Sequence, residues 1–325
     1  MNLTLNRFWL RRIDPRAALQ QSVVNLDNIG VFYTRQQLYY EVSLCLSPPA
    51  LVAAVSRLVA VTGVTLACTV RQLPPVWTGI ANAAALIGAP PLVGWLPFTI
   101  TPPLSYDAFN EVLAAFSVRY GQPRRLLTDE PSSPAVRVPR EPDLYDYGMP
   151  FAIVCQDAAI ARMLRANGLH MELECAVLSL TEATPLPDSV LGMLMLAPAP
   201  CVFLLHDASI AGLGVVANAR TLLNVPTEIS VRSLGLRPRD ALHQHLFAIR
   251  QVKNDRWIPT ALAELDFIER RWLSAGYTTQ VAALRPLKLL RTLRRAVSTQ
   301  LRYSSSWLTR VRQWHTTGYM TWPDQ

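Results

Sequence analysis

The sequence predicts an α/β protein whose C-terminal half is built on a parallel sheet. Three apolar runs, at residues 151–155, 175–180 and 201–206, alternate with helix-like segments. This alternation is typical of a parallel sheet covered by helices on both faces. The third run ends abruptly in His206 and Asp207. Because ligands of open α/β sheets bind just past the carboxyl ends of the strands, Asp207 is the first candidate site residue.

The segments around these strands complete the predicted half. Helical patterns cover residues 157–169, 188–196 and 213–223. A β-branched run at 226–231 predicts a fourth, short strand. The following LGLRPRD at 234–240 predicts a turn into another helix. We therefore expect the order strand, helix, strand, helix, strand, helix, strand.

The N-terminal half is predicted to be mainly helical. A helix containing Tyr39 and Tyr40 is expected to reach Leu46, because two prolines follow. A second helix at 49–61 and a strand at 64–73 would be compatible with a winged-helix unit. Beyond a Pro-rich apolar stretch, apolar residues at helical spacing predict a helix from an N-cap at Ser105 to a stop at Gly121. The polar, Pro-rich stretch at 128–146 is the predicted linker.

Composition limits the possible partners and compartments. The net charge of +8 and an isoelectric point near 9.5 favour an acidic partner, either nucleic acid or an anionic membrane. The apolar runs at 51–70 and 76–100 are interrupted by Arg57 or by prolines, so a membrane span is not expected. The cysteines form no metal-binding or disulfide pattern and read as buried thiols of a reducing, cytoplasmic compartment: Cys45, Cys68, Cys155, Cys175 and Cys201.

Positive charge is concentrated at the C-terminus, where no Asp or Glu occurs from Arg270 to Pro323. An amphipathic helix is predicted there, with leucines on one side and five candidate DNA-binding cations: Arg285, Lys288, Arg291, Arg294 and Arg295. Such a helix could bind phosphate backbones, lie on an anionic membrane, or pack with a solvated basic face. The sequence leaves these three alternatives open.

Two motifs together resemble a known family. Asp207 and Gly212 at a strand end, followed by the Leu-Gly-x-x-Pro-x-Asp turn that ends at Asp240, resemble the Toprim domain of the family formed by topoisomerase VI A and its meiotic relative Spo11. The pair Tyr39–Tyr40 resembles the tyrosine-bearing helix of the winged-helix domain that precedes the Toprim domain in that family. The order of the two motifs along the chain is also the family's order.

The resemblance implies a chemistry and names its candidate residues. In the family a tyrosine, with an arginine four residues before it, attacks a DNA phosphodiester. Either Tyr40 is that tyrosine, with Gln36 at the arginine position, or Tyr39 is, with Arg35 before it. The family holds Mg²⁺ with three acids, and in chain order this sequence has Gln156, Asp207 and Ser209 at those positions. Asp157 is the one nearby acid that could assist Asp207 as a metal ligand.

One acid with two neutral groups would bind Mg²⁺ poorly, so the sequence predicts a member that keeps the fold and has lost the cleavage chemistry. No cofactor is then expected, and Mg²⁺ only if the site still functions. The leading hypothesis is a DNA-binding protein. The alternatives are an active tyrosine-dependent DNA-cleaving enzyme or Toprim nuclease, and a membrane-surface or protein-interaction scaffold. The resemblance also implies a homodimer and an ATPase partner subunit.

Four regions are predicted along the chain. They are a winged-helix-like domain with the tyrosine pair, a Pro-rich extension with a helix and linker, a Toprim-like α/β domain, and a basic helical tail, at residues 1–75, 76–146, 147–260 and 261–325. His206 is expected to be a structural residue. His243 and His245, two residues apart, are not expected to share a metal because that spacing points them to different helix faces.

Overall fold

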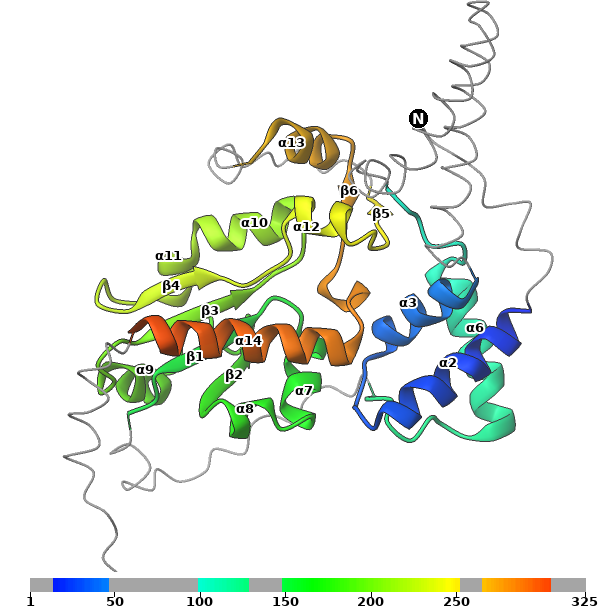
Figure 1. Cartoon of the computed structure of the whole chain (residues 1–325), viewed down its shortest axis with the longest axis horizontal. Helices are drawn as coiled ribbons and strands as arrows, with labels where there is room; N and C mark the ends of the chain where they lie inside the picture. Colours follow the sequence, from blue (N-terminus) through cyan, green and yellow to red (C-terminus); the bar gives the residue numbers. More distant parts are fainter. Residues whose placement is uncertain (1–13, 47–98, 129–147, 252–264, 305–325) are drawn as a thin grey trace, which may run out of the picture.

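A computed structural model describes residues 14–46, 99–128, 148–251 and 265–304 of the chain. Figure 1 shows a group of helices from the N-terminal part beside a sheet with its own helices. The predicted α/β class is confirmed. The predicted second helix at 49–61, the strand at 64–73, nearly all of the linker and Cys68 lie outside the described residues.

The centre of the fold is a four-stranded parallel sheet in the order β2-β1-β3-β4. Its strands are β1 (Phe151–Cys155), β2 (Cys175–Ser179), β3 (Cys201–Leu205) and β4 (Ser230–Ser233). The three predicted apolar runs are neighbouring parallel strands, which confirms that prediction. The fourth strand begins a few residues later than expected, where pairing with β3 determines its register.

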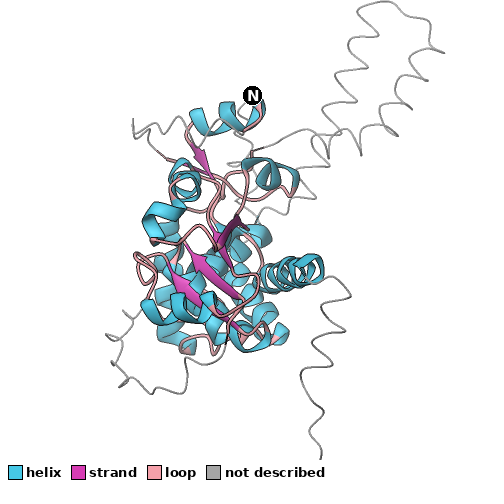
Figure 2. Ribbon diagram, turned by 90° about the vertical axis from the view of Figure 1, so that its left-hand side faces the viewer, coloured by secondary structure: helices cyan, strands magenta, loops and turns pink. Residues whose placement is uncertain are grey.

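Side chains of the strands alternate between two apolar cores, and Figure 2 shows the strands lying between helices. In β1, Phe151 and Ile153 point into the larger core, whereas Ala152 and Val154 point into the smaller one. Both faces of the sheet are therefore buried. This explains why β1 and β3 read as continuous apolar runs in the sequence.

Helices follow the strands as the alternation predicts. They are α7 (Ala158–Ala166), α8 (Leu169–Glu172), α9 (Asp188–Met195), α10 (Ile210–Ala217), α11 (Ala219–Leu223) and α12 (Pro238–His243). The segment predicted as one helix at 213–223 is two, because the chain leaves the helical path at Asn218. The turn before α12 and the helix after it are confirmed, with Pro238 at the first helical position.

Three helices from the N-terminal part join the larger core. They are α2 (Pro15–Ile29), α3 (Arg35–Leu46) and α6 (Tyr106–Tyr120). The predicted α6 is confirmed at both ends, since the Ser105 hydroxyl accepts a hydrogen bond from the Ala108 amide and Gly121 follows the last turn. Helix α2 was not predicted, although Asp14 as N-cap, Pro15 and Gly30 are start and stop signals.

The C-terminal segment returns across the molecule. It contains β5 (Ile249–Arg250), α13 (Phe267–Ser274), β6 (Tyr277–Thr278), the 3₁₀ turn η3 (Val281–Ala283) and α14 (Pro286–Ser304). Helix α14 is the predicted basic amphipathic helix and runs across the sheet in Figure 1. Its apolar side is buried in the larger core through Leu289, Leu290, Leu293 and Val297. This helix is therefore an integral part of the fold.

Two further expectations concern membranes and cysteines. Within the described ranges, no helix is long and apolar enough to cross a membrane. The four cysteines in those ranges are free thiols, and three of them are buried: Cys155, Cys175 and Cys201. Burial raises the pKa of each of these three thiols. These cysteines belong to the apolar core, as small apolar side chains often do.

Candidate functional site

The carboxyl ends of β1 and β3 form the switch point of the sheet. From β1 the chain moves outward to β2 and then returns past β1 to form β3 on its other side. Gln156 and Asp157 follow β1, and Asp207 and Ser209 follow β3. The predicted site residues of the sheet are thus brought to one edge, where ligands of this fold class bind.

Gln156 and Asp207 are joined directly at this edge. The Gln156 side-chain oxygen Oε1 accepts a hydrogen bond from the Asp207 backbone amide at 3.0 Å. Gly212 packs against both residues. A Cβ atom at Gly212 would lie 2.3 Å from the Asp207 carbonyl oxygen and 2.9 Å from Gln156 Oε1. The glycine at position 212 of the first motif is therefore explained by the close packing of α10 on the sheet edge.

The edge is covered by the chain that leads into η3. Ala208 and Thr279 exchange two backbone hydrogen bonds, at 2.9 and 3.1 Å. The Asp207 carboxylate oxygen Oδ1 accepts the Val281 backbone N–H at 2.7 Å. Val281 and Ala282 are each only 2% exposed. At this edge, Asp207 therefore holds the backbone of a buried covering segment.

Burial dominates the electrostatics of Asp207. It raises the pKa of the carboxyl from 3.8 to about 6, and the nearby Asp157 carboxylate adds to the rise. The hydrogen bond from the Val281 amide acts in the opposite direction, because it favours the charged form. Asp207 is consequently a partly desolvated acid without a cationic partner among the groups that shift its pKa.

The remaining predicted metal-site oxygens cap helices. Asp157 accepts the Ala159 amide at 2.8 Å and is the N-cap of α7, and Ser209 accepts the Gly212 amide at 2.9 Å and is the N-cap of α10. Mg²⁺ prefers several carboxylate oxygens in octahedral geometry. Two acids that each already accept a backbone N–H, beside an amide and a hydroxyl that do the same, do not fit this ion. No cluster of three metal-ligating acids, histidines or cysteines occurs in the part of the chain that the structure describes.

Tyr40 reaches the same covering segment from α3. Its hydroxyl donates to the side-chain oxygen Oε1 of Gln280 at 2.9 Å, one residue before the amide that binds Asp207. Only 2% of Tyr40 is exposed, and burial is the main cause of its strongly raised pKa, with Tyr39 and Asp207 adding to the rise. Tyr40, one of the two candidate tyrosines, and Asp207, the candidate metal ligand, therefore contact the neighbouring residues 280 and 281.

Tyr39 is also turned into the protein. Its hydroxyl donates to the Leu104 carbonyl at 2.8 Å, and its ring packs edge-on against Tyr106. Burial raises the pKa of Tyr39 to about 12. Arg35 and Gln36, the two candidates for the assisting position, are half-buried in the first turn of α3. In α3, Arg35 lies one helical turn before Tyr39, and Gln36 lies one helical turn before Tyr40. The helix is therefore compatible with either tyrosine as the counterpart of the family's tyrosine.

His206 has the structural role expected for it. Its Nδ1 lies 2.9 Å from the Asp207 carbonyl oxygen and its Nε2 lies 2.8 Å from the Ser233 hydroxyl. Since a carbonyl can only accept, Nδ1 carries the proton and Nε2 accepts from Ser233. Burial lowers the pKa of His206. A Cβ atom at Gly235 would lie 2.2 Å from the His206 ring, which explains the glycine of the second motif.

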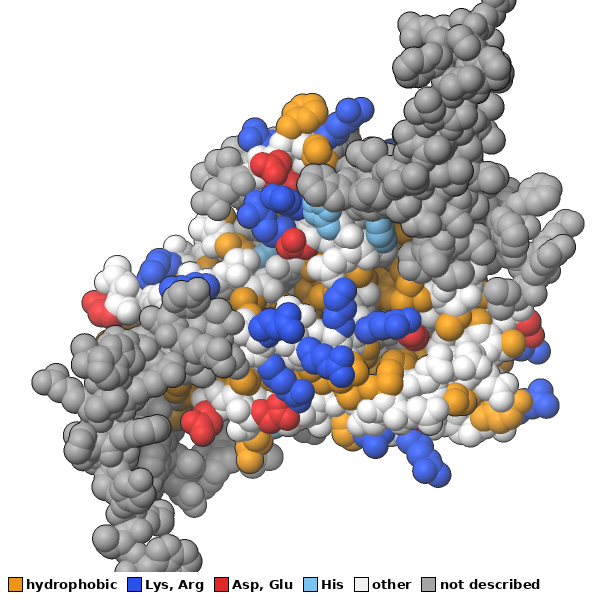
Figure 3. All heavy atoms as spheres, viewed as in Figure 1, with side chains coloured by type: hydrophobic (Ala, Val, Ile, Leu, Met, Phe, Trp, Pro, Cys, Tyr) orange, Lys and Arg blue, Asp and Glu red, His pale blue; other side chains and the backbone are white. Residues whose placement is uncertain are grey.

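Four of the predicted DNA-binding cations lie on α14, and Arg285 directly precedes this helix. Two of them form ion pairs with acids of neighbouring helices: Arg285 with Glu41 at 3.0 Å, and Arg294 with Glu172 through two hydrogen bonds of 2.6 and 2.8 Å. Lys288, Arg291 and Arg295 are exposed on the outer face. Figure 3 shows Lys and Arg side chains gathered on this side of the molecule. We call Lys288, Arg291 and Arg295 the cationic face of α14.

Several parts of the site were not predicted from the sequence. They are the 3₁₀ turn η3, the contact between Tyr40 and Gln280, and helix α13. For α13 a signal existed, since Asp266 and Glu269 have the spacing of a capping box and form one. Comparisons with protein-family models, with curated proteins and with solved structures found no match.

Proposed function

We propose that this protein binds nucleic acid through the cationic face of α14, on a fold that keeps a Toprim-like sheet without its cleavage chemistry. The observation that carries the proposal is the presence of three exposed cations on one side of a helix whose other side is buried in the core. In the same proposal, helices α2 and α3 belong to a winged-helix-like unit. The homodimer and the ATPase partner subunit implied by the resemblance remain predictions.

The spacing of the cationic face suits a phosphate backbone. Lys288 and Arg295 are two helical turns apart, which corresponds to about 10 Å along the helix axis. One strand of duplex DNA carries a charge about every 3.4 Å along its axis. The face therefore spans about three phosphates, and Arg285 lies three residues before Lys288, directly before α14. Contacts of this kind supply affinity without strong sequence preference.

The packing of α14 favours nucleic acid over a membrane surface. An amphipathic helix binds a bilayer by inserting its apolar side among the lipids. In this fold that side is buried against the sheet, with Leu290, Leu293 and Val297 each no more than 2% exposed. In the part of α14 whose side chains are described, the exposed residues are all polar: Lys288, Arg291, Thr292 and Arg295. This arrangement supports binding to charges that are themselves on a surface, such as phosphates.

The state of the sheet edge supports the loss of cleavage. A nucleophilic tyrosine must reach a phosphodiester and give up its proton. Tyr39 and Tyr40 are buried, and both hydroxyls donate to oxygens of the protein. The acids at the edge hold backbone amides. We therefore expect supercoiled DNA to stay intact with Mg²⁺ or Mn²⁺, and no covalent adduct to be trapped by detergent. A nick or adduct that disappears in Tyr39→Phe, Tyr40→Phe or Asp207→Ala would establish the enzyme alternative.

The binding proposal is tested by a salt series. Duplex DNA binding is measured from 50 to 300 mM salt for the protein and for a triple variant with Lys288→Gln, Arg291→Gln and Arg295→Gln. The loss of three phosphate contacts should flatten the slope of log affinity against log salt by about 2.7. The matched control neutralises three exposed arginines on α6, α12 and α13, namely Arg119, Arg239 and Arg271. Equal slopes for both triple variants would reject the cationic face as the contact.

A further inference from the structure

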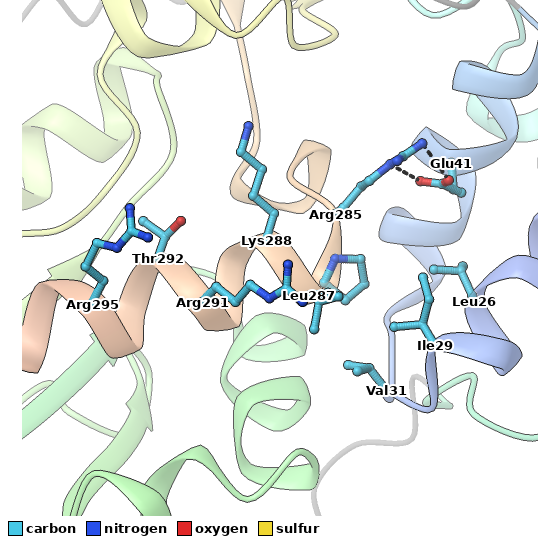
Figure 4. A pocket seen from close by; sticks show the side chains of 11 residues that line it. Leu26, Ile29, Val31, Glu41, Arg285, Leu287, Lys288, Arg291, Thr292 and Arg295 are labelled. Carbon is cyan, nitrogen blue, oxygen red and sulfur yellow. Dashed lines mark hydrogen bonds and ion pairs between the residues drawn. The ribbon is translucent and has the colours of Figure 1, made fainter.

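A groove lies between the first turns of α14 and the end of α2 (Figure 4). Its volume is about 540 Å³, within the range of small-molecule sites. One wall is aliphatic and comes from α2, from the turn after it and from α14: Leu26, Ile29, Val31, Pro286 and Leu287. The basic lining residues, which we call the rim, are Arg285, Lys288, Arg291 and Arg295. The groove therefore joins an apolar surface to a cluster of positive charge.

The apolar wall depends on the way α2 ends. Gly30 has a φ of 79°, a left-handed conformation that reverses the chain, and its amide binds the Asp27 carbonyl. The reversal allows Ile29 before the turn and Val31 after it to line the same groove. Ile29 is 46% exposed, which is a high value for a side chain of this type. An apolar group in the groove would remove this surface from water.

Lys288 and Arg291 bring exposed positive charge to the rim. Glu41 is the one acid in the lining, and both of its carboxylate oxygens bind the Arg285 guanidinium. Pro286, Leu287 and Lys288 in the first turn of α14 also line the groove, and a helix N-terminus favours a negative group. In Figure 4 the Lys288 side chain extends away from α14, and the Arg291 side chain runs along the helix towards Leu287. The occupant that complements the rim is therefore an anion.

We infer that this groove binds a small amphiphilic anion, a carboxylate or phosphate carried on an aliphatic body. The head group would lie against Lys288 and Arg291, and the aliphatic body against Ile29, Val31 and Leu287. An inorganic anion would leave the apolar wall exposed to water. A neutral apolar molecule would leave the positive charge of the rim without an anionic partner from the ligand. The same chemistry could be supplied by a soluble acid or by an anionic lipid. The inference goes beyond nucleic-acid binding and does not require it.

Three probes test separately whether the anionic head group and the aliphatic body contribute to binding. Titration calorimetry of the full chain is carried out with decyl phosphate at submicellar concentration, with inorganic phosphate and with decanol. We expect saturable one-to-one binding of decyl phosphate, with inorganic phosphate and decanol at least tenfold weaker. Vesicles of anionic phospholipid distinguish the two sources, because a lipid ligand would give vesicle binding that depends on Ile29. Decanol that binds as tightly as decyl phosphate would overturn the inference.

Matched variants locate the site. Ile29→Gln removes the apolar wall and Lys288→Gln with Arg291→Gln removes the rim, and each should weaken decyl phosphate binding at least tenfold. That factor corresponds to about 1.4 kcal/mol. The controls are Val118→Gln and Arg119→Gln on α6, where Val118 is 90% exposed and neither residue lines the groove. Circular dichroism verifies that each variant is folded. Unchanged binding in Ile29→Gln would contradict the inference.

The outcome also separates this inference from the proposed function. Ile29→Gln leaves every cation in place, so the salt dependence of DNA binding should not change. If DNA binding fails for the parent protein while decyl phosphate still binds, the groove inference stands alone. If decyl phosphate shows no binding to a parent protein that does bind DNA, the groove inference is rejected and the proposed function is kept.

Discussion

The carboxyl edge of the sheet and the outer face of α14 carry charged groups in opposite situations. At the sheet edge, the oxygens of Gln156, Asp157, Asp207 and Ser209 each accept a backbone amide, and a buried segment covers Asp207. On α14, Lys288 and Arg291 project from an outer face whose other side is buried. Side-chain oxygens that already accept a backbone N–H have fewer lone pairs for a ligand. Exposed cations on a helix that is packed on its other side remain accessible to one. This difference is the reason that the proposed function places binding on the helix, whereas the oxygens of the edge hold the backbone.

The largest expected effect tests the close packing of the sheet edge. Gly212→Ala would place a Cβ atom 2.3 Å from the Asp207 carbonyl oxygen, so α10 or the strand end must move. We expect urea denaturation to show a loss of about 3 kcal/mol or more. Gly192→Ala in α9 is the control, because nothing lies within 4 Å of its added Cβ. It should raise stability by about 0.5 to 1 kcal/mol. Similar effects of the two substitutions would contradict close packing at Gly212.

The second effect tests whether Asp207 is a structural acid in a desolvated place. Its folded-state pKa is raised to about 6 from 3.8, so the folded protein retains this proton more strongly than the unfolded chain. The stabilisation is therefore complete below about pH 4 and is lost as pH rises to about 6. Relative to Asp207→Asn, the parent protein should lose about 3 kcal/mol of unfolding free energy across this window. A constant difference between the two proteins would show that Asp207 titrates normally.

A smaller effect tests the contact of α3 with the covering segment. Tyr40→Phe removes the hydroxyl that donates to Gln280 and keeps the ring, so we expect a loss of about 1 kcal/mol. Tyr120→Phe is the control, because Tyr120 is 56% exposed and its change should stay within about 0.5 kcal/mol. If Tyr40→Phe is neutral, the hydrogen bond between the helix and residue 280 does not contribute to holding the edge closed.

The sheet could be predicted from the sequence because local patterns determine it. Apolar runs such as Phe151–Cys155 and Cys201–Leu205 are long enough to indicate buried strands, and helical spacing between them indicates crossovers. Ser105 likewise predicted the start of α6 through its capping chemistry. Asp207 was correctly expected at the carboxyl edge for the same reason.

The covering of that edge could not be predicted, because it depends on contacts between residues far apart in the chain. The Tyr40 hydroxyl meets Gln280 across 240 positions, and the Asp207 carboxylate meets the Val281 amide across 74. Hydrophobic periodicity in the sequence does not indicate hydrogen bonds between residues so far apart. The same holds for Glu41 and Arg285, which pair across 244 positions. Charge alone predicted the set of cations and not the ion pairs that Arg285 and Arg294 form.

A single pair of variants can test whether DNA binds to α14 and not to the sheet edge. DNA affinity is measured across a salt series for two double substitutions of equal design. One combines Tyr40→Phe with Asp207→Asn at the edge, and the other combines Lys288→Gln with Arg291→Gln on the helix. We expect the parent slope for the edge variant and a slope flatter by about 1.8 for the helix variant. A parent slope for the helix variant, with binding lost in the edge variant, would contradict this assignment.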